Sequence, residues 1–151
     1  MKLYISSDTT KQLQDYVMLS PCQNTPLFKK IEFENLEKLV CDAQATEIIL
    51  DHALCYAPAT KLYDILTLIV KKMHHGAQLI VCDLDVEEIL RLYSEYKITL
   101  GELNVSLYGY EYPKRSVFSQ KTIVEILKEL GLKIMKRRYN EIEFVVEAKR
   151  Q

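Results

Sequence analysis

Asp51 and His52 are the pair of side chains in this sequence best suited to acid–base chemistry. They directly follow the apolar run EIIL at 47–50, which is typical of a buried strand. Open α/β sheets bind their ligands at the carboxyl ends of the strands, so His52 would lie there as a general base and Asp51 would orient the bound molecule. The alternative is structural, with a hydrogen-bonded His52 and with Asp51 as the last residue of the strand.

A second acidic pair, Asp83 and Asp85, lies in the run LIVCDLDVE. This run resembles the nucleophile motif of haloacid-dehalogenase phosphatases, in which the first aspartate attacks phosphorus, the second is the general acid, and Mg²⁺ is bound between the phosphate and the carboxylates. However, Glu87 occupies the usual Thr or Val position, and no later aspartate completes a metal site. We therefore favour a strand that ends at Asp83 and a helix capped by Asp85 and Glu88, with no metal. A glycosyltransferase site is a weaker alternative.

Three alternating tyrosines and two cations form the one aromatic and basic cluster of the chain, in the run YGYEYPKR. Its members are Tyr108, Tyr110, Tyr112, Lys114 and Arg115. Such rings could stack on a base or sugar while the cations contact phosphate, so we name Tyr108, Tyr110 and Arg115 as candidate substrate-binding residues. The same residues could equally form a covering flap or a contact in a homo-oligomer, because tyrosine is favoured at interfaces.

Composition predicts one globular domain over residues 1–151. Hydrophobic residues make up 48% and charged residues 27%, and the net charge of −1 does not indicate a nucleic-acid partner. No apolar run could span a bilayer and no signal-peptide pattern opens the chain, so we expect a cytoplasmic location and no membrane partner. The four cysteines lack the spacing of a zinc site and are expected as reduced thiols in or near the core.

Hydrophobic spacing predicts alternating strands and helices around these residues. Short apolar runs bounded by turn residues predict buried strands, whereas apolar residues spaced three and four apart predict helices. The strands are expected at 2–6, 16–19, 47–50 and 79–82, and the helices at 33–41, at 59–73, from 85 onward and from 119 to 130. Residues 21–31 and 98–118 are expected to be irregular, and Gly76 is expected to stop the second helix.

The end of the chain predicts an antiparallel hairpin. Two strand-like runs, 132–138 and 141–148, are separated only by Tyr139 and Asn140. A parallel crossover needs a dozen or more residues, so these strands must pair antiparallel. The sequence thus predicts an α/β, Rossmann-like fold whose mostly parallel sheet is closed by a C-terminal antiparallel hairpin.

Four segments, in order, resemble the short class I S-adenosylmethionine-dependent methyltransferases. They are MKLYISSD…DYVMLSP, TEIILDHALCYAP, LIVKKMHHGAQLIV and LYGYEYPKRSVFSQKTIVEILKELGLKI. The corresponding segments of the family are of the forms MKLNLGCG…GYINVDP, DEIYASHVLEHLP and IYRVLKPGGRLRI, followed by a late Tyr-Gly segment. The resemblance implies the class I methyltransferase fold, S-adenosylmethionine as the cofactor, and a cofactor site formed by Ser6, Ser7, Asp8 and Ser20. It places Asp51 and His52 near the methyl acceptor.

The sequence departs from this family where the cofactor would bind. Family members place glycines after the first strand because the backbone approaches the methionine part of the cofactor closely. Ile5, Ser6, Ser7 and Asp8 stand at those positions, so side chains occupy that space. Asp8 also brings a negative charge beside the expected carboxylate of the ligand.

Further departures concern the second strand and the segment after the third. Ser20 replaces the acidic residue that accepts hydrogen bonds from the ribose, and Cys55-Tyr56 replaces a Glu-His pair. Residues 7–15 leave room for a turn or two of helix at best. We therefore expect weak or lost cofactor binding and a pseudoenzyme that acts by binding a small molecule or protein or by assembly. The alternative is an active methyltransferase on an unknown small-molecule, sugar or nucleotide acceptor.

Overall fold

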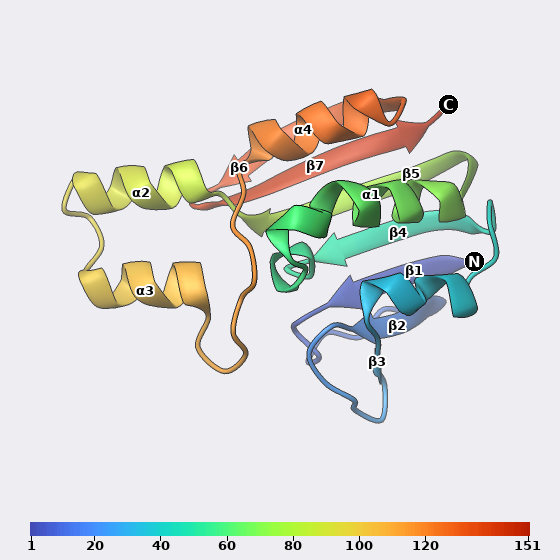
Figure 1. Ribbon diagram of the computed structural model, residues 1–151, viewed down its shortest axis with the longest axis horizontal. Coiled ribbons are helices and arrows are strands. Elements are labelled where there is room, and N and C mark those ends of the chain that lie inside the picture. The colour runs from blue at the N-terminus through green and yellow to red at the C-terminus, as the bar shows by residue number, and fades with distance from the viewer.

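The computed structural model describes residues 1–151 and contains one seven-stranded mixed sheet (Figure 1). The strand order across the sheet is β3-β2-β1-β4-β5-β7-β6. The strands are β1 (Lys2–Ser6), β2 (Tyr16–Ser20), β3 (Lys29–Lys30), β4 (Ala45–Asp51), β5 (Met73–Leu84), β6 (Leu132–Asn140) and β7 (Glu143–Arg150). The first five pair in parallel, and β7 pairs antiparallel with both β5 and β6. The predicted fold class is confirmed.

The helices lie between the strands or beyond the carboxyl edge of the sheet. The α-helices are α1 (Leu62–Lys72), α2 (Val86–Ser94), α3 (Leu100–Tyr108) and α4 (Gln120–Glu129). Short 3₁₀ helices are η1 (Phe33–Lys38), η2 (Leu54–Tyr56) and η3 (Ala59–Lys61). In Figure 1, α2 and α3 form a helical hairpin that projects from the carboxyl edge, whereas α1 and α4 lie along the sheet. None of the helices combines the length and the apolar content that crossing a bilayer requires.

Chain direction explains why the helices gather on one face of the sheet. Right-handed crossovers that move toward β6 must lie on one face, and crossovers that move toward β3 must lie on the other. The connections through η1, α1 and α4 all move toward the β6 edge and share a face, where η1 and α4 both contact α1. The two connections that move toward β3, residues 7–15 and 21–28, contain no helix. The second face of the sheet, the open face, therefore carries no helix, although Phe28 of the second connection packs against Tyr4 on it.

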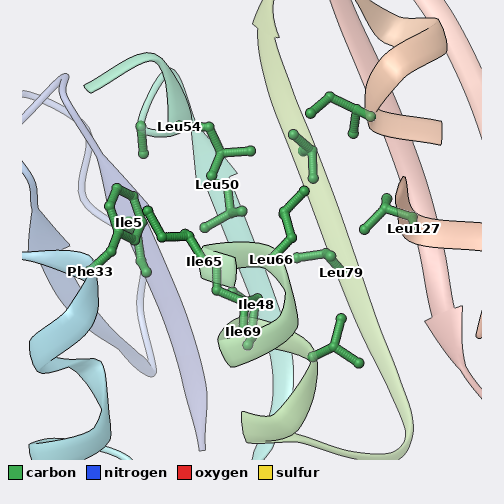
Figure 2. Close-up of a cluster of buried hydrophobic side chains, with 14 of the residues drawn as sticks. Ile5, Phe33, Ile48, Leu50, Leu54, Ile65, Leu66, Ile69, Leu79 and Leu127 are labelled. Atoms are coloured by element: carbon green, nitrogen blue, oxygen red, sulfur yellow. The ribbon is translucent and has the colours of Figure 1, made fainter. Parts of the chain in front are cut away.

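The core lies between the sheet and the helices on the covered face (Figure 2). The apolar residues of α1 recur every three or four positions, so Ile65, Leu66 and Ile69 all point at the sheet and are almost fully buried. They pack over Ile48 and Leu50 of β4. This stripe confirms the helix predicted from the spacing of residues 59–73.

Successive side chains of every strand point alternately to the covered face and to the open face. Tyr4, Ile49 and Ile80 occupy neighbouring positions in the register of β1, β4 and β5, and the two isoleucines are only partly buried. Ion pairs between adjacent strands cover part of this face, from Lys2 to Glu47 at 3.1 Å and from Arg138 to Glu147 at 2.6 Å. The open face is thus a polar and apolar mixture that tolerates water.

Two segments expected to be irregular contain regular structure. α3 lies within 98–118, where Thr99 and Glu102 form a reciprocal capping box that outweighs the glycine at 101. β3 lies within 21–31 and is only two residues long, too short to give a period-two signal. Conversely, the helix predicted at 33–41 is the 3₁₀ helix η1, which ends at Lys38.

Two boundaries also differ from those expected. α1 ends at Lys72, and His74, His75 and Gly76 belong to β5, where Gly76 has φ +80° and lies opposite a break in the β4–β5 register. The hairpin turn is at Glu141-Ile142, because Tyr139 and Asn140 remain paired in β6 and Glu141 adopts φ +57°. All four thiols are free, but Cys41 is exposed, contrary to the expectation of a place near the core.

Candidate functional site

The predicted site residues meet at the carboxyl edge of the sheet because the parallel strands end there side by side. β1 ends at Ser6, β2 at Ser20 and β4 at Asp51. Ligands of open α/β sheets bind in the crevice beyond this edge. Two different features occupy it: a pocket, and a cluster of charged side chains on the open face.

The loop after β1 is held by its own side chains. Ser6 Oγ accepts a hydrogen bond from the Asp8 backbone amide at 3.0 Å, and Asp8 Oδ1 accepts two from Thr10, at 2.9 and 2.6 Å. The bonds from Thr10 hold the pKa of the Asp8 carboxyl below its usual range. The only left-handed residue of this connection is Asp15, with φ 64°. The loop therefore follows a path that needs no glycine, and Asp8 is charged at neutral pH.

A pocket of about 510 Å³ lies between this loop and the segment that follows α3. Ser7 and Asp8 line one side, and Tyr110 and Tyr112 line the other, so the structure brings together candidate residues about 100 positions apart. The remaining lining residues are Thr9, Thr10, Gln23, Tyr56, Leu84, Val105, Ser106, Gly109, Glu111 and Lys114. This is the place that the resemblance assigns to the methionine part of the cofactor.

A chain of hydrogen bonds joins the two sides of the pocket. Tyr112 donates through its hydroxyl to Gln23 Oε1 at 2.9 Å, and Gln23 Nε2 donates to Thr9 Oγ1 at 2.8 Å. Gly109 allows the turn that brings Tyr112 back, because it has φ +84° and any Cβ there would collide with the Tyr112 carbonyl oxygen. Residues 108–114 thus form a flap that is fastened to the loops after β1 and β2.

Ser6 and Ser20 lie beneath the pocket instead of lining it. Both are fully buried. Ser20 Oγ accepts hydrogen bonds from the backbone amides of Cys22 at 3.2 Å and Gln23 at 3.4 Å, so it shapes the loop after β2. No carboxylate stands in this position to accept bonds from ribose hydroxyls, and Gln23, which does reach the pocket, is already bonded at both ends.

Tyr108 and Arg115 also lie outside the pocket lining. The Tyr108 side chain is exposed, and its backbone carbonyl accepts the Lys114 amide at 2.9 Å, which closes the flap turn. Arg115 is exposed, and its backbone amide donates to the carbonyl of Cys55 at 2.8 Å. Of the three candidate substrate-binding residues, Tyr110 alone lines the pocket. Tyr112 and Lys114, from the same cluster, line it as well.

Asp51 and His52 lie in the charged cluster on the open face. Asp51 Oδ2 accepts hydrogen bonds from the Tyr4 hydroxyl at 2.6 Å and from Lys11 Nζ at 2.9 Å. Asp51 Oδ1 lies 2.7 Å from His52 Nδ1, and His52 Nε2 lies 3.0 Å from Glu143 Oε1. The imidazole is therefore clamped between two carboxylates. Neither Asp51 nor His52 is among the residues that line the pocket.

The charged cluster lowers the pKa of Asp51 and raises the pKa of His52, so it favours the charged form of both. Burial alone would raise the pKa of Asp51, but hydrogen bonds from His52, Tyr4 and Lys11 outweigh it and hold that pKa well below the usual range. Burial would lower the pKa of His52, but the hydrogen bond to Asp51 and the nearby carboxylates raise it overall. A protonated imidazole bound by two carboxylates is a poor general base.

Sequence reasoning missed three members of this cluster: Tyr4, Lys11 and Glu143. Tyr4 lies in an apolar run, where it looked like a core residue, and Glu143 lies in a strand far along the chain. The strand alternation could have found Tyr4, because it shares a face with the last residue of β4 in a parallel pairing of β1 and β4. Lys11 could not be placed, because its loop has no regular structure.

Asp83 is almost fully buried at the end of β5. Its Oδ1 accepts the Leu84 amide at 2.9 Å, Oδ2 has no partner, and burial raises the pKa of the carboxyl. It lines a cavity of about 10 Å³, close to the size of one water molecule. A phosphoryl group does not fit there.

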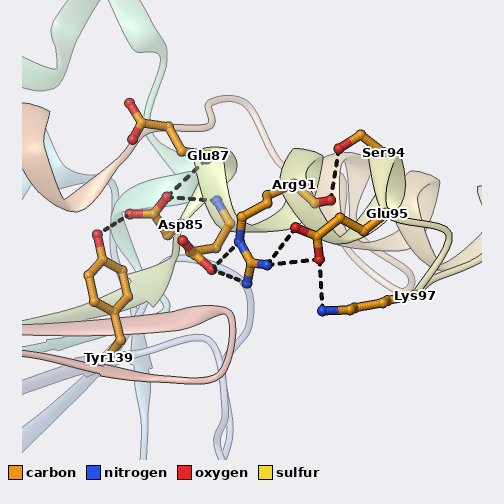
Figure 3. Close-up of polar contacts among 8 residues, drawn as sticks. Asp85, Glu87, Arg91, Ser94, Glu95, Lys97 and Tyr139 are labelled. Atoms are coloured by element: carbon orange, nitrogen blue, oxygen red, sulfur yellow. Dashed lines mark hydrogen bonds and ion pairs between the residues drawn. The ribbon is translucent and has the colours of Figure 1, made fainter.

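Asp85 is a structural residue (Figure 3). Its Oδ1 caps α2 by accepting the amides of Glu87 and Glu88, and its Oδ2 accepts the Gln120 amide at 2.8 Å and the Tyr139 hydroxyl at 3.1 Å. It therefore ties together α2, α4 and β6. With both oxygens bonded and no surface exposed, it has no free atom for catalysis. Nothing in this geometry favours the phosphotransfer alternative.

Solved structures share this architecture over almost the whole chain. An S-adenosylmethionine-dependent methyltransferase from Archaeoglobus fulgidus superposes with a TM-score of 0.69 and 11% identity, covering 99% of this chain and 85% of that protein. The chain adopts the fold of S-adenosylmethionine-dependent methyltransferases. Similar enzymes from Methanosarcina mazei (TM-score 0.65, 16% identity, 99% and 91% covered) and Thermotoga maritima (0.67, 15%, 99% and 82%) show the same methyltransferase fold. No protein-family model and no curated protein matches the sequence.

Proposed function

We propose that this chain is a methyltransferase-fold protein with weak or lost affinity for S-adenosylmethionine, and that it acts through binding or assembly. The observation that carries the proposal is the loop after β1. Asp8 lines the pocket as a charged carboxylate held by Thr10. The ligand's own carboxylate would have to approach this charge, and like charges near a protein surface repel by about 1 kcal/mol or more.

The fastened flap supports the same conclusion. The Tyr112–Gln23–Thr9 hydrogen bonds occupy Gln23, which lies three residues after Ser20, the position where the resemblance places the group that binds the ribose. A cofactor that took these groups would have to break two existing hydrogen bonds, so the net gain from each new bond is small. The pocket is consequently better suited to a small polar ligand than to a whole nucleoside.

The helical hairpin of α2 and α3 supports a role in protein contacts. α3 has no buried residue, and exposed apolar side chains line the hairpin and the flap: Tyr93, Tyr96, Leu100, Val105, Tyr108 and Tyr110. Apolar patches of this kind mark interaction surfaces.

A second copy of the chain is the first partner to test. Light scattering should give a dimer, and Leu100→Ser should shift it toward monomer; a monomer at all concentrations would contradict self-assembly.

Thermal shift with S-adenosylmethionine tests the cofactor claim. Ligand that binds only the folded state raises the melting temperature, so about 1 mM ligand should leave the natural chain unchanged if its Kd exceeds that concentration. Asp8→Asn removes the charge with little change of shape and should bring a measurable shift. Asp64→Asn, which removes an exposed charge on α1, is the matched control and should not. A clear shift for the natural chain would overturn the proposal.

A second candidate, an active methyltransferase, is supported by the pocket itself. Its volume of about 510 Å³ falls within the usual range for ligand sites, about 300–1,000 Å³, and it lies where the fold binds ligands. In that case Ser7 and Asp8 would contact the cofactor and Tyr110 the acceptor. The same titration separates the two candidates, because activity requires saturable binding of S-adenosylmethionine.

A further inference from the structure

The charged cluster on the open face contains a set of donor atoms that the pocket does not use. Asp51, His52 and Cys82 each offer one ligand atom, and these atoms lie within 4.8 Å of one another. They come from the adjacent ends of β4 and β5, where Asp51 and Cys82 are paired in the register. We propose that Asp51, His52 and Cys82 bind one Zn²⁺ ion.

The spacing of the donors is close to that of a tetrahedral site. Bonds of about 2.0–2.3 Å to zinc place neighbouring ligand atoms about 3.3–3.7 Å apart. Asp51 Oδ1 and His52 Nδ1 are now 2.7 Å apart, at hydrogen-bond distance. The contact would open by about half an ångström, and Cys82 Sγ, which lies within 4.8 Å of both atoms, would close by at most about one, which side-chain rotation can supply. The zinc ion replaces the proton that the imidazole and carboxylate share.

The neighbours of the three ligands are placed as supporting groups of a metal site. Glu143 Oε1 lies 3.0 Å from His52 Nε2, so it would accept that N–H while Nδ1 binds the metal, an arrangement common at metal-bound histidines. Tyr4 and Lys11 donate to Asp51 Oδ2 and leave Oδ1 for the ion. The His52 amide donates to the Cys82 carbonyl at 2.8 Å and fixes the two ligands relative to each other.

The chemistry of the donors selects zinc over the common alternatives. Mg²⁺ and Ca²⁺ prefer oxygen ligands, whereas thiolate and imidazole together favour Zn²⁺ or Co²⁺. Binding would convert the Cys82 thiol to a thiolate and displace the proton between His52 and Asp51, so two protons would be released to the buffer. His52 and Cys82 are partly exposed on the open face, so an ion has a path of entry and water can take the fourth position.

The site does not depend on S-adenosylmethionine, because none of its ligands lines the pocket. If the proposal of weak cofactor affinity fails, the zinc proposal therefore still stands. If the zinc proposal fails, the cofactor proposal still stands.

Titration with Co²⁺, and then displacement by Zn²⁺, tests the proposal on the purified full chain. We expect one equivalent to bind with a thiolate-to-cobalt absorption, and a tenfold excess of Zn²⁺ to abolish it, while Mg²⁺ has no effect. Cys82→Ser should remove the absorption and weaken Zn²⁺ binding at least tenfold, and His52→Gln should weaken it similarly. Proton release into a weak buffer gives an independent readout.

The controls address the other thiols and histidines. Cys41→Ser removes the exposed thiol and His74→Gln removes an exposed imidazole, and neither should change the stoichiometry or the affinity. Circular dichroism checks that every variant is folded. The proposal is overturned if the natural chain shows no saturable Zn²⁺ binding, or if Cys82→Ser and His52→Gln bind as the natural chain does.

Discussion

The two faces of the sheet are built from the same strands but differ in what covers them. On the covered face, Leu50 of β4 and Leu79 of β5 are fully buried under α1. On the open face, the neighbouring residues Ile49 and Ile80 keep part of their surface exposed, and Lys2 and Glu47 form an ion pair across the strands. The first face stabilises the fold, and the second presents side chains to solvent.

The difference between the two faces depends on the two short connections, residues 7–15 and 21–28, that lack helices. Residues 7–15 and 21–28 would cross the open face as helices if they were longer, by the handedness of parallel crossovers. As loops, they cover only part of that face, where Phe28 packs on Tyr4, and Lys11 from the first loop is the group that reaches Asp51. The charged cluster and the loop near the cofactor position thus share one element, the short connection between β1 and β2.

Truncation at adjacent residues of β4 should separate the stabilities of the two faces most clearly. Leu50→Ala removes a fully buried side chain from the covered face and should lower the free energy of unfolding by about 2–5 kcal/mol. Ile49→Ala, one residue away on the open face, should cost less than half as much because water already reaches it. Urea unfolding measures both. Equal losses would mean that the open face is covered in solution.

The two aspartates at the end of β5, Asp83 within the strand and Asp85 just after it, should differ next most strongly in their effect on stability. Asp85→Asn places a donor opposite the Gln120 amide or the capped amides of α2, and it should lower the free energy of unfolding by about 1–3 kcal/mol. Asp83→Asn is the matched control, because Asp83 Oδ2 has no partner to lose, and it should be neutral or stabilising. Chemical denaturation decides, and a larger loss at Asp83 would reverse our assignment of roles.

The Lys2–Glu47 ion pair on the open face should have the smallest effect on stability. Burial would raise the pKa of Glu47, but hydrogen bonds from Tyr16 and Lys2 lower it overall. A lowered pKa in the folded state adds stability above the unfolded value of about 4.5, and that stability is lost as the pH falls through the folded value. Glu47→Gln should remove this pH dependence and cost less than about 1 kcal/mol at pH 7. Melting temperatures from pH 3 to pH 7 are the measurement, and an unchanged pH profile in the variant would contradict the assignment.

Much of the fold follows from local patterns in the sequence. The period of the apolar residues defines α1, and the closeness of the last two strands requires an antiparallel hairpin. α3 was missed because the weak apolar signal after Thr99 hides a helix that depends on its capping box and on packing against α2.

The candidate site was only partly predictable. Ser7, Asp8 and Tyr110 were named from their motifs, and the structure brings them to one pocket. Ser6 and Ser20 were named for the same reason, but their hydroxyls turn inward to the loop backbones, which no motif reveals. The contact of Lys11 with Asp51 arises from the path of an irregular loop, and such a path is set by tertiary packing.

Calorimetric titration of the unaltered chain with S-adenosylhomocysteine measures directly whether the affinity for the cofactor is weak or lost. This product keeps the amino-acid end and the nucleoside of the cofactor. It therefore tests binding to the pocket beside Asp8 without any methyl acceptor. We predict no saturable heat up to about 1 mM ligand, which corresponds to less than about 4 kcal/mol of binding free energy. A one-to-one isotherm with a Kd of a few micromolar, roughly 7–8 kcal/mol, would contradict the account.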